Sequence, residues 1–254
     1  MRHLFIGDVH GMAVELRALV AKLALRPDDV LVFVGDLVDK GPESPEVVRI
    51  VRELADRCEV VLVEGNHEEK HRRFRRHLAA GSTVADEMTG SEEMHRITAD
   101  LTAEDAGFLD GAVPFHRVPA HGVLVIHAGV TEDMRRFPAS LEAVSRMTNK
   151  QRRSFNRILR TRFVSAATGK FLMFGTNEPG DPYWADVYDG RFGHIVFGHE
   201  PFLEGPREFD HATGVDTGAV FGGTLTALVL SDGAPARSFV SVPSRGKFCE
   251  RVQE

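Results

Sequence analysis

Short apolar runs recur along the chain without the polar alternation expected of a strand with one face in water. They cover residues 3–7, 30–34, 60–64, 122–127 and 194–198. Uninterrupted apolar runs of this length are typical of strands whose sheet is covered on both faces. The pattern therefore predicts five short strands in a buried, mostly parallel sheet.

Helical periodicity fills the two gaps between the first three runs. Leu16, Leu19 and Leu23 recur at steps of three and four residues, as one buried helix face requires. The stretch SPEVVRIVREL places Ser44 as a candidate N-cap and Pro45 at the first helical position. Strand, helix, strand, helix, strand is the start of a doubly wound α/β fold with right-handed crossovers.

After the third apolar run, the pattern favours helices and a final hairpin over regular strand–helix alternation. Residues 82–118 have helical signals, with Thr102 as a helix cap, and we interpret them as a helical insert or cap beside the active face. Another helical stretch covers about 141–163, and the end of the chain predicts a β-hairpin that joins a second sheet. Neither a repeat nor a linker divides the chain, so we expect a single domain over residues 1–254.

Composition narrows the class of protein without changing this picture. The 254 residues are 43% hydrophobic and 27% charged, which is ordinary for a globular protein and excludes disordered and fibrous classes. The net charge of −6 argues against non-specific nucleic-acid binding but leaves a nucleotide substrate possible. We expect no membrane span, because no apolar stretch approaches about 20 residues. We also expect no secretory signal, because Asp8 and His10 come before an apolar h-region could fit. Two cysteines, without metal-type spacing, favour a reduced cytoplasmic location.

Polar residues follow each of the five predicted strands, usually beside a glycine. They are Asp8 and His10, Asp36 and Asp39, Asn66 and His67, His127, and His199. Because the carboxyl ends of parallel strands share one edge of a sheet, these side chains are expected to meet at one site. One Asp in a turn or one His after an apolar run is usually structural, but five such coincidences at strand ends are improbable.

The donor types at this edge indicate a metal site. Carboxylates, imidazoles and one carboxamide, with no thiolate, suit Mn, Fe, Zn, Co or Ni ions. Two such ions about 3.5–4 Å apart and bridged by a carboxylate form an arrangement used for in-line attack on phosphorus.

The motifs GDVHG, GDLVDKG, GNHE, HAG and GHE, in this order, resemble the signature of calcineurin-like (phosphoprotein-phosphatase-type) metallophosphoesterases. The resemblance covers residues 4–230, nearly the whole chain. Residues 181–202 and 214–228 look like the bacterial branch with dinucleoside-polyphosphate hydrolases and the phosphatase module of polynucleotide kinase-phosphatase. The resemblance implies a four-layer α/β/β/α sandwich that holds two divalent ions, with Mn favoured.

The same resemblance implies a role for each motif residue. Asp8 and His10 would hold the first metal, Asp36 would bridge both, and the second would be completed by Asn66, His127 and His199. The nucleophile would be a hydroxide that bridges the two ions.

His67 would act as general acid, oriented by Asp39. A His–Asp pair raises the basicity of the imidazole, so that its proton is available near neutral pH. The family usually has Arg where this chain has Lys40, and an ammonium binds phosphate as a point charge rather than a planar fork. Lys40 and Arg162 are the candidate phosphate-binding residues; the alternative for each is a solvent-facing side chain.

Three further features leave alternatives open. The basic run at 67–78 is either an ordinary solvated helix or an electropositive rim that recruits polyphosphate or a nucleic-acid end. Tyr183 and Trp184 either stack on a base or pack their loop onto the core. Asp216 is a turn acid or the partner of a ligand histidine.

The sequence therefore predicts a two-metal phosphoesterase that hydrolyses a phosphomonoester or phosphoanhydride. A dinucleoside polyphosphate such as diadenosine tetraphosphate is the favoured substrate. The alternatives are a phosphatase for Ser/Thr or Tyr phosphoproteins, a phosphatase for nucleic-acid ends, a metal-dependent nuclease, and a binding protein that has lost catalysis. The intact ligand set and the His67–Asp39 pair argue against the last of these.

Overall fold

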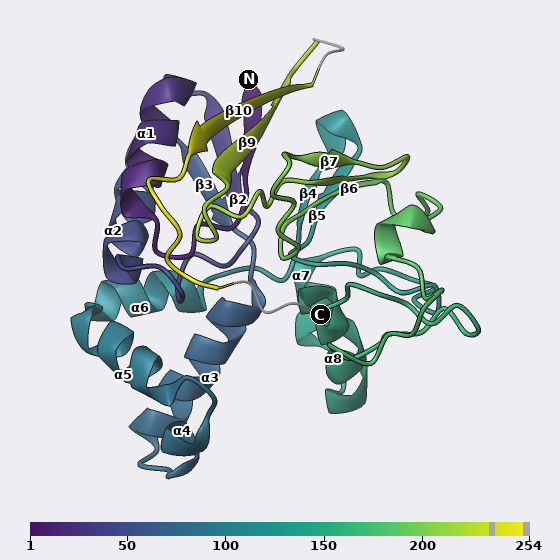
Figure 1. Ribbon diagram of the computed structural model, residues 1–254, viewed down its shortest axis with the longest axis horizontal. Helices are drawn as coiled ribbons and strands as arrows, with labels where there is room; N and C mark the ends of the chain where they lie inside the picture. Colours follow the sequence, from purple (N-terminus) through teal and green to yellow (C-terminus); the bar gives the residue numbers. More distant parts are fainter. Residues whose placement is uncertain (234–236, 251–254) are drawn as a thin grey trace.

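A computed structural model, which describes residues 1–233 and 237–250, places two five-stranded sheets face to face (Figure 1). The order of the first sheet is β10 (Ser238–Pro243), β9 (Thr224–Ser231), β1 (Arg2–Ile6), β2 (Asp29–Phe33), β3 (Glu59–Leu62). Its strands β1, β2 and β3 are parallel, as predicted, and β9 and β10 are antiparallel to their neighbours. The hairpin at the end of the chain therefore extends the first sheet, and the prediction that it joins a second sheet is wrong.

The second sheet is built from the later apolar runs. Its order is β4 (His116–Val118), β5 (Val123–Val125), β6 (His194–Phe197), β8 (Ala212–Gly214), β7 (Arg207–Glu208). Strands β5, β6 and β8 are parallel, and the two edge strands are antiparallel. The five predicted strands are thus confirmed, but they are shared between two sheets. Their uniform burial could not distinguish one sheet from two, because both inner and outer faces are covered.

Three hydrophobic layers hold the two sheets between helices. Phe5, Val125 and Leu228 belong to the core between the sheets. Leu4 and Ile6, which point to the opposite face of β1, pack with α1 (Ala13–Leu23) and α2 (Ser44–Ala55). The expected four-layer α/β/β/α arrangement is confirmed.

The outer face of the second sheet is covered by short helical pieces. They are α7 (Leu141–Ser145), α8 (Asn149–Phe155) and the 3₁₀ turns η2 (Asn156–Leu159) and η3 (Trp184–Asp186). The single helical stretch expected at 141–163 is broken here, since Thr148 caps a new helix by accepting a hydrogen bond from the Gln151 amide.

The region at 82–118 contains short helices, as expected, but the expectation that it holds no strand is wrong, because it ends in one. The helices are α4 (Val84–Glu87), α5 (Ser91–Asp100) and α6 (Ala103–Asp110), followed by β4 and the 3₁₀ turn η1 (Pro119–His121). Thr102 caps α6, as predicted. Phe74 of α3 (Asn66–Ala79) packs with Ala85 and Met94 in a small separate core, so that α3, α4 and α5 form one lobe (Figure 1).

Ser44 is not the N-cap of α2. It is the first residue of the helix, and its hydroxyl accepts a hydrogen bond from the Asp39 amide at 3.0 Å. The side chain therefore braces the loop after β2 instead of the helix end. None of the helices in the described part of the chain is both long and apolar enough to cross a membrane.

Candidate active site

The polar residues after five strands meet on one side of the molecule, although the strands belong to two sheets. The first sheet supplies the loops after β1, β2 and β3, and the second supplies His127 after β5 and His199 after β6. Because the parallel strands of both sheets end on the same side, their loops enclose one site. Its centre is the buried carboxylate of Asp36, which is 1% exposed.

The loop backbones at this site have conformations that side-chain-bearing residues rarely adopt. His10, Asp36, Asp39, Lys40 and His199 have φ angles of 44°, 53°, 70°, 66° and 67°. A positive φ costs a residue with a Cβ atom free energy, and such residues concentrate where the backbone must aim a functional side chain. The left-handed conformations therefore mark the same loops that the motifs do.

Two groups of metal-binding side chains share Asp36. One consists of His10, Asp36 and His67, and the other of Asp36, His127 and His199. The Asp36 Oδ2 atom lies 3.6 Å from His10 Nε2 and 3.3 Å from His127 Nε2. A carboxylate between two imidazole groups has the position that a bridging ligand of two ions requires.

Asp8, Asn66 and His199 complete the surroundings of Asp36. The Asn66 Oδ1 atom lies 3.0 Å from His127 Nε2, and Asp8 Oδ2 lies 3.9 Å from His10 Nε2. Both carboxylate oxygens of Asp8 accept a hydrogen bond from the His199 amide. The His199 Nε2 atom is buried and has no hydrogen-bond partner among the described residues, as expected for a donor aimed at a cation.

The electrostatics of the group suit cation binding. Burial would raise the pKa of Asp36, but the imidazoles of His127, His67 and His10 lower it well below the usual value. Burial lowers the pKa of both His10 and His199, which keeps these rings neutral. Metal ligands must be ionised carboxylates and neutral imidazoles, which suits Asp36, His10 and His199. Burial and neighbouring carboxylates raise the pKa of Asp8 well above its usual value, and Asp36 raises the pKa of His127 against the effect of burial, so these two residues would lose a proton when a cation binds.

His67 makes a separate contact. Its Nδ1 atom lies 2.6 Å from Asp39 Oδ2, and its Nε2 atom faces Asp36 Oδ2 at 3.8 Å. The other Asp39 oxygen lies 2.6 Å from Nε2 of the fully buried His71. Hydrogen bonds from His67 and His71 outweigh burial and lower the pKa of Asp39, which keeps the carboxylate charged. His71 was missed by the sequence analysis, although it lies one helical turn after His67.

Glu68 is the second residue that the sequence analysis missed. Its buried carboxylate accepts hydrogen bonds from the amides of Asp36 at 2.7 Å, Leu37 at 2.8 Å and Gly65 at 2.9 Å. It therefore joins the loop after β2 to the start of α3. Its place in a capping position of that helix was a signal that could have found it.

Lys40 and Arg162 lie on the wall of the cleft above these groups. The Lys40 Nζ atom lies 2.9 Å from His10 Nε2. Arg162 donates from Nε to Glu200 Oε2 at 2.7 Å and from Nη2 to the His199 carbonyl at 3.1 Å. Both cations line a cleft of about 790 Å³ whose floor includes Asp36, Asn66, His67 and His199.

The aromatic pair Tyr183–Trp184 and the acidic residue Asp216 have structural roles. Trp184 is 1% exposed and packs in the outer core of the second sheet, next to Tyr183, so the core-packing interpretation is correct. Asp216 is buried and accepts a hydrogen bond from the Gly218 amide at 2.9 Å, as a turn acid does. Burial raises the pKa of Asp216 to about 6.

Comparison with known proteins agrees with this geometry. Residues 1–217 match the family model described as calcineurin-like phosphoesterase, which confirms the resemblance inferred from the motifs. The asymmetrical bis(5'-nucleosyl)-tetraphosphatase PrpE of Halalkalibacterium halodurans is 32% identical over 94% of this chain and 93% of its own length. The protein of that name from Geobacillus thermodenitrificans is 35% identical over 94% and 93%.

Solved structures are similar to this chain over nearly its whole length. A crystal structure described as that of a candidate diadenosine tetraphosphatase superposes with a TM-score of 0.70 at 27% identity, covering 96% of this chain and 95% of its own. A metallophosphoesterase from Sphaerobacter thermophilus, at 17% identity and a TM-score of 0.53, shares the fold and covers 96% and 89%.

Proposed function

Because the chain belongs to the calcineurin-like phosphoesterase family and is therefore a hydrolase, we propose that it cleaves a dinucleoside polyphosphate at a two-metal centre. The observation that supports this most directly is the Asp36 carboxylate shared by two groups of donors on the floor of a cleft. Relatives named as asymmetrical tetraphosphatases suggest cleavage of diadenosine tetraphosphate to ATP and AMP.

We propose that six side chains hold the ions. They are Asp8 and His10 for the first ion, Asp36 for both, and Asn66, His127 and His199 for the second. The buried, unpaired Nε2 atom of His199 and the neutral state of His10 support this assignment. The ions would neutralise charge on the phosphoryl oxygens and lower the pKa of a bound water molecule toward neutrality. Mn²⁺ suits these oxygen and nitrogen donors.

His67 would donate a proton to the leaving oxygen. Its Nδ1 atom is held by Asp39, which leaves Nε2, 3.8 Å from Asp36 Oδ2, as the atom that would reach the leaving oxygen. Asp39 is in turn held by His71 and stays charged, so it fixes the orientation of the His67 ring. His67 also lies close enough to His10 and Asp36 to share an ion with them, and we assign it the role of general acid from the resemblance of the GNHE motif to the family pattern.

The cleft wall supports a substrate with several phosphates and attached bases. Lys40 lies 5.3 Å from the centre of the Phe221 ring, and Arg162 lies 5.6 Å from that of Phe174. Phosphate charges would be met by the two cations, while the adjoining aromatic surfaces offer places for a base to stack. Phe174 is 57% exposed, so its ring is accessible to such a base.

The basic run does not favour a nucleic-acid end as substrate. Lys70, Arg72, Arg73 and Arg75 each lie within ion-pair distance of an acidic side chain. Their charge is therefore compensated locally, that of Lys70 by Asp39 of the site and that of the three arginines by Glu64, Glu69 and Asp110. Free cysteines at 58 and 249 are consistent with a reducing compartment, and we propose a cytoplasmic location.

The test is product analysis by chromatography. Protein stripped of metal and restored with Mn²⁺ is incubated with diadenosine tetraphosphate, and ATP plus AMP are the expected products. ADP alone would retain the nucleotide substrate but overturn the asymmetric cleavage. If the dinucleotide stays intact while an aryl phosphate is hydrolysed, the substrate proposal fails, and phosphoproteins and nucleic-acid ends become the candidates.

The His67→Ala variant tests the general acid. We expect turnover to fall by about 10²–10⁴ with Mn²⁺ content unchanged, because the proton donor is lost while the six ligands remain. Metal content is measured by mass spectrometry on the same samples. An Asp36→Asn variant serves for comparison and is expected to lose both metal and activity. Unchanged turnover of His67→Ala would remove His67 from the mechanism.

A further inference from the structure

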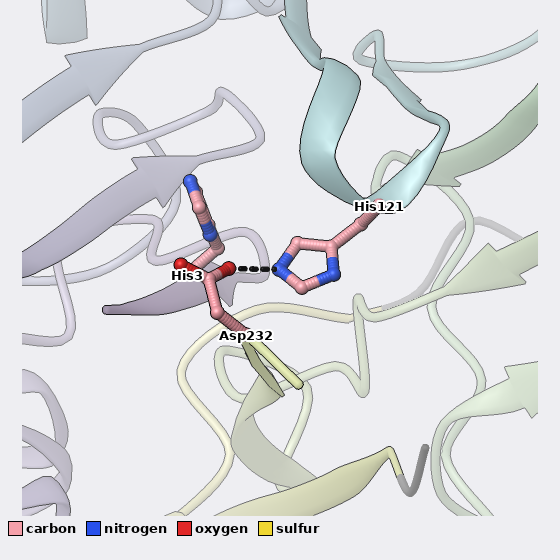
Figure 2. A group of neighbouring side chains, drawn as sticks. All are labelled: His3, His121 and Asp232. Carbon is pink, nitrogen blue, oxygen red and sulfur yellow. Dashed lines mark ion pairs between the residues drawn. The ribbon is translucent and has the colours of Figure 1, made fainter. Parts of the chain in front are cut away.

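A second cluster of metal-binding side chains lies at the opposite ends of the strands. His3 on β1, His121 in η1 and Asp232 in the turn after β9 point toward one another (Figure 2). His3 is near the start of β1 and Asp8 follows its end. In the same way, His121 precedes β5 and His127 follows it. The cluster therefore lies at the amino ends of the strands whose carboxyl ends form the active site.

The fold explains why these side chains meet. His3 points to the same face of β1 as Phe5, which belongs to the core between the two sheets. His121 lies in the short connection between β4 and β5 of the second sheet, and Asp232 follows β9, the strand that pairs with β1. One residue thus comes from each of three segments that are far apart in the sequence.

The distances suit a shared cation. One donor atom of each residue lies within 4.8 Å of the other two, and His121 Nε2 lies 3.3 Å from Asp232 Oδ1. The His3 and His121 rings are nearly perpendicular, with centroids 5.0 Å apart. Neighbouring donors of a tetrahedral zinc ion, at bonds of about 2.0–2.1 Å, are separated by roughly 3.4 Å. The His121–Asp232 pair already has this spacing, and the donor atom of His3 lies within 4.8 Å of both.

Two of the donor atoms lack a satisfactory partner. His3 is 8% exposed, and its Nδ1 atom is buried without a hydrogen-bond partner among the described residues; the same holds for His121 Nε2. A buried polar atom without a partner is costly, and a hydrogen bond between His121 and Asp232 would still leave His3 unpaired. A cation between the three residues would satisfy all of them at once.

The charges around the cluster are compatible with that cation. Burial and the neighbouring His121 lower the pKa of His3, which keeps this ring neutral and able to bind a metal. The amino group of Met1 lies 3.9 Å from Asp232 Oδ2 and 3.5 Å from Asp28 Oδ2. The Met1 contact with Asp232 is to Oδ2, whereas Oδ1 faces His121 and is the oxygen placed for a ligand bond.

We propose that His3, His121 and Asp232 form a separate binding site for a transition-metal ion of the Zn²⁺ class. Two imidazoles and one carboxylate are a set that Zn²⁺ accepts, with a fourth position open to water. The ion would connect β1, the second sheet and the β9–β10 turn, so that its binding free energy stabilises the contact between the two sheets. This inference does not depend on the substrate proposed above.

The experiment counts zinc per chain after equilibrium dialysis against buffered Zn²⁺, with mass-spectrometric detection. His121→Ala and Asp232→Asn are each expected to bind one zinc ion fewer than the unmodified protein. The result is the zinc content of the unmodified protein minus that of each variant. Both have the same active site, so zinc bound there does not contribute to the difference. The Mn²⁺-supported phosphoesterase activity of both variants is expected to stay unchanged.

His95→Ala is the matched control. His95 also pairs with an aspartate, Asp86, at 2.8 Å, but it is outside any group of three donors among the described residues. This variant is expected to retain the full zinc content. Zn²⁺ is also expected to raise the melting temperature less in His121→Ala and Asp232→Asn than in His95→Ala. Equal zinc contents in the unmodified protein and all three variants would overturn the proposed site. If His121→Ala fails to fold, Asp232→Asn still provides the test, because Asp232 lies in an exposed turn.

Discussion

At the scale of single residues, several charged groups of the active site hold backbone or other side chains instead of the substrate. Glu68 shows this most clearly, because its carboxylate accepts three amide hydrogen bonds from two loops. Asp39 similarly connects His67 to His71. The positions of Asp36 and His67 thus depend on residues that do not reach the cleft floor themselves.

Glu68→Gln is expected to lower the free energy of unfolding by about 2–4 kcal/mol. The neutral amide replaces one acceptor oxygen by an NH₂ group that faces amide donors, so hydrogen bonds to a charged group are lost and a buried donor is left unpaired. Urea unfolding of the metal-free protein measures the effect. Glu69→Gln is the control, since the neighbouring Glu69 pairs with the side chains of Arg160 and Arg73 and not with the backbone amides that Glu68 holds. Equal stability of the two variants would contradict the bracing role of Glu68.

At the scale of elements, the junctions between strands and loops depend on glycines. Without a Cβ atom, such a glycine lets a candidate metal-binding side chain lie against the backbone. A Cβ atom on Gly198 would overlap the Asp8 Oδ1 atom and the side chain of Val34. The carboxylate of Asp8 can therefore accept the His199 amide only because the residue before His199 has no side chain.

Gly198→Ala is expected to weaken Mn²⁺ binding and activity by roughly 10–100-fold, the size of effect seen when a group that orients a metal ligand is displaced. Gly107→Ala provides the comparison. Gly107 lies inside α6 with open space at its Cβ position, so alanine is expected to stabilise the protein by up to about 1 kcal/mol. Metal titration and urea unfolding of both variants give the answer. Normal Mn²⁺ affinity in Gly198→Ala would mean that Asp8 is not positioned by this contact.

The elements also show what the sequence could and could not predict. The apolar runs located the strands, and the glycine-flanked motifs located the loops that enclose Asp36, because both are local signals. Sheet membership was not predictable from them: the final hairpin pairs with β1, which depends on contacts between residues 2–6 and 227–231. His71 and Glu68 were missed because their importance comes from tertiary hydrogen bonds to the loop after β2. Ser44 was misassigned for the same reason, since its hydroxyl bonds to Asp39 and not to its own helix.

At the scale of the whole molecule, the two sheets are joined by polar contacts as well as by the core between them. Arg237, next to β10 of the first sheet, lies 3.0 Å from Nε2 of His194 on β6 of the second. The same imidazole nitrogen lies 2.8 Å from the Thr213 hydroxyl on β8. Burial and the Arg237 charge lower the pKa of His194 to about 4, so this contact between the sheets requires a neutral ring.

The stability of the molecule is therefore expected to depend on His194 between pH 6.5 and pH 4. In this range the unfolded chain binds a proton at His194 that the folded chain does not, so the folded state loses stability as the pH falls. Because the ring is partly exposed, we expect a loss of about 1–2 kcal/mol, less than the full shift would give. The measurement is the free energy of unfolding in urea at pH 7.5 and pH 4.5 for the metal-free protein and for His194→Gln. Glutamine does not titrate, so the variant is expected to lose less stability on acidification by that amount. An identical pH dependence of the two proteins would show that the contact between Arg237 and His194 does not keep the ring neutral.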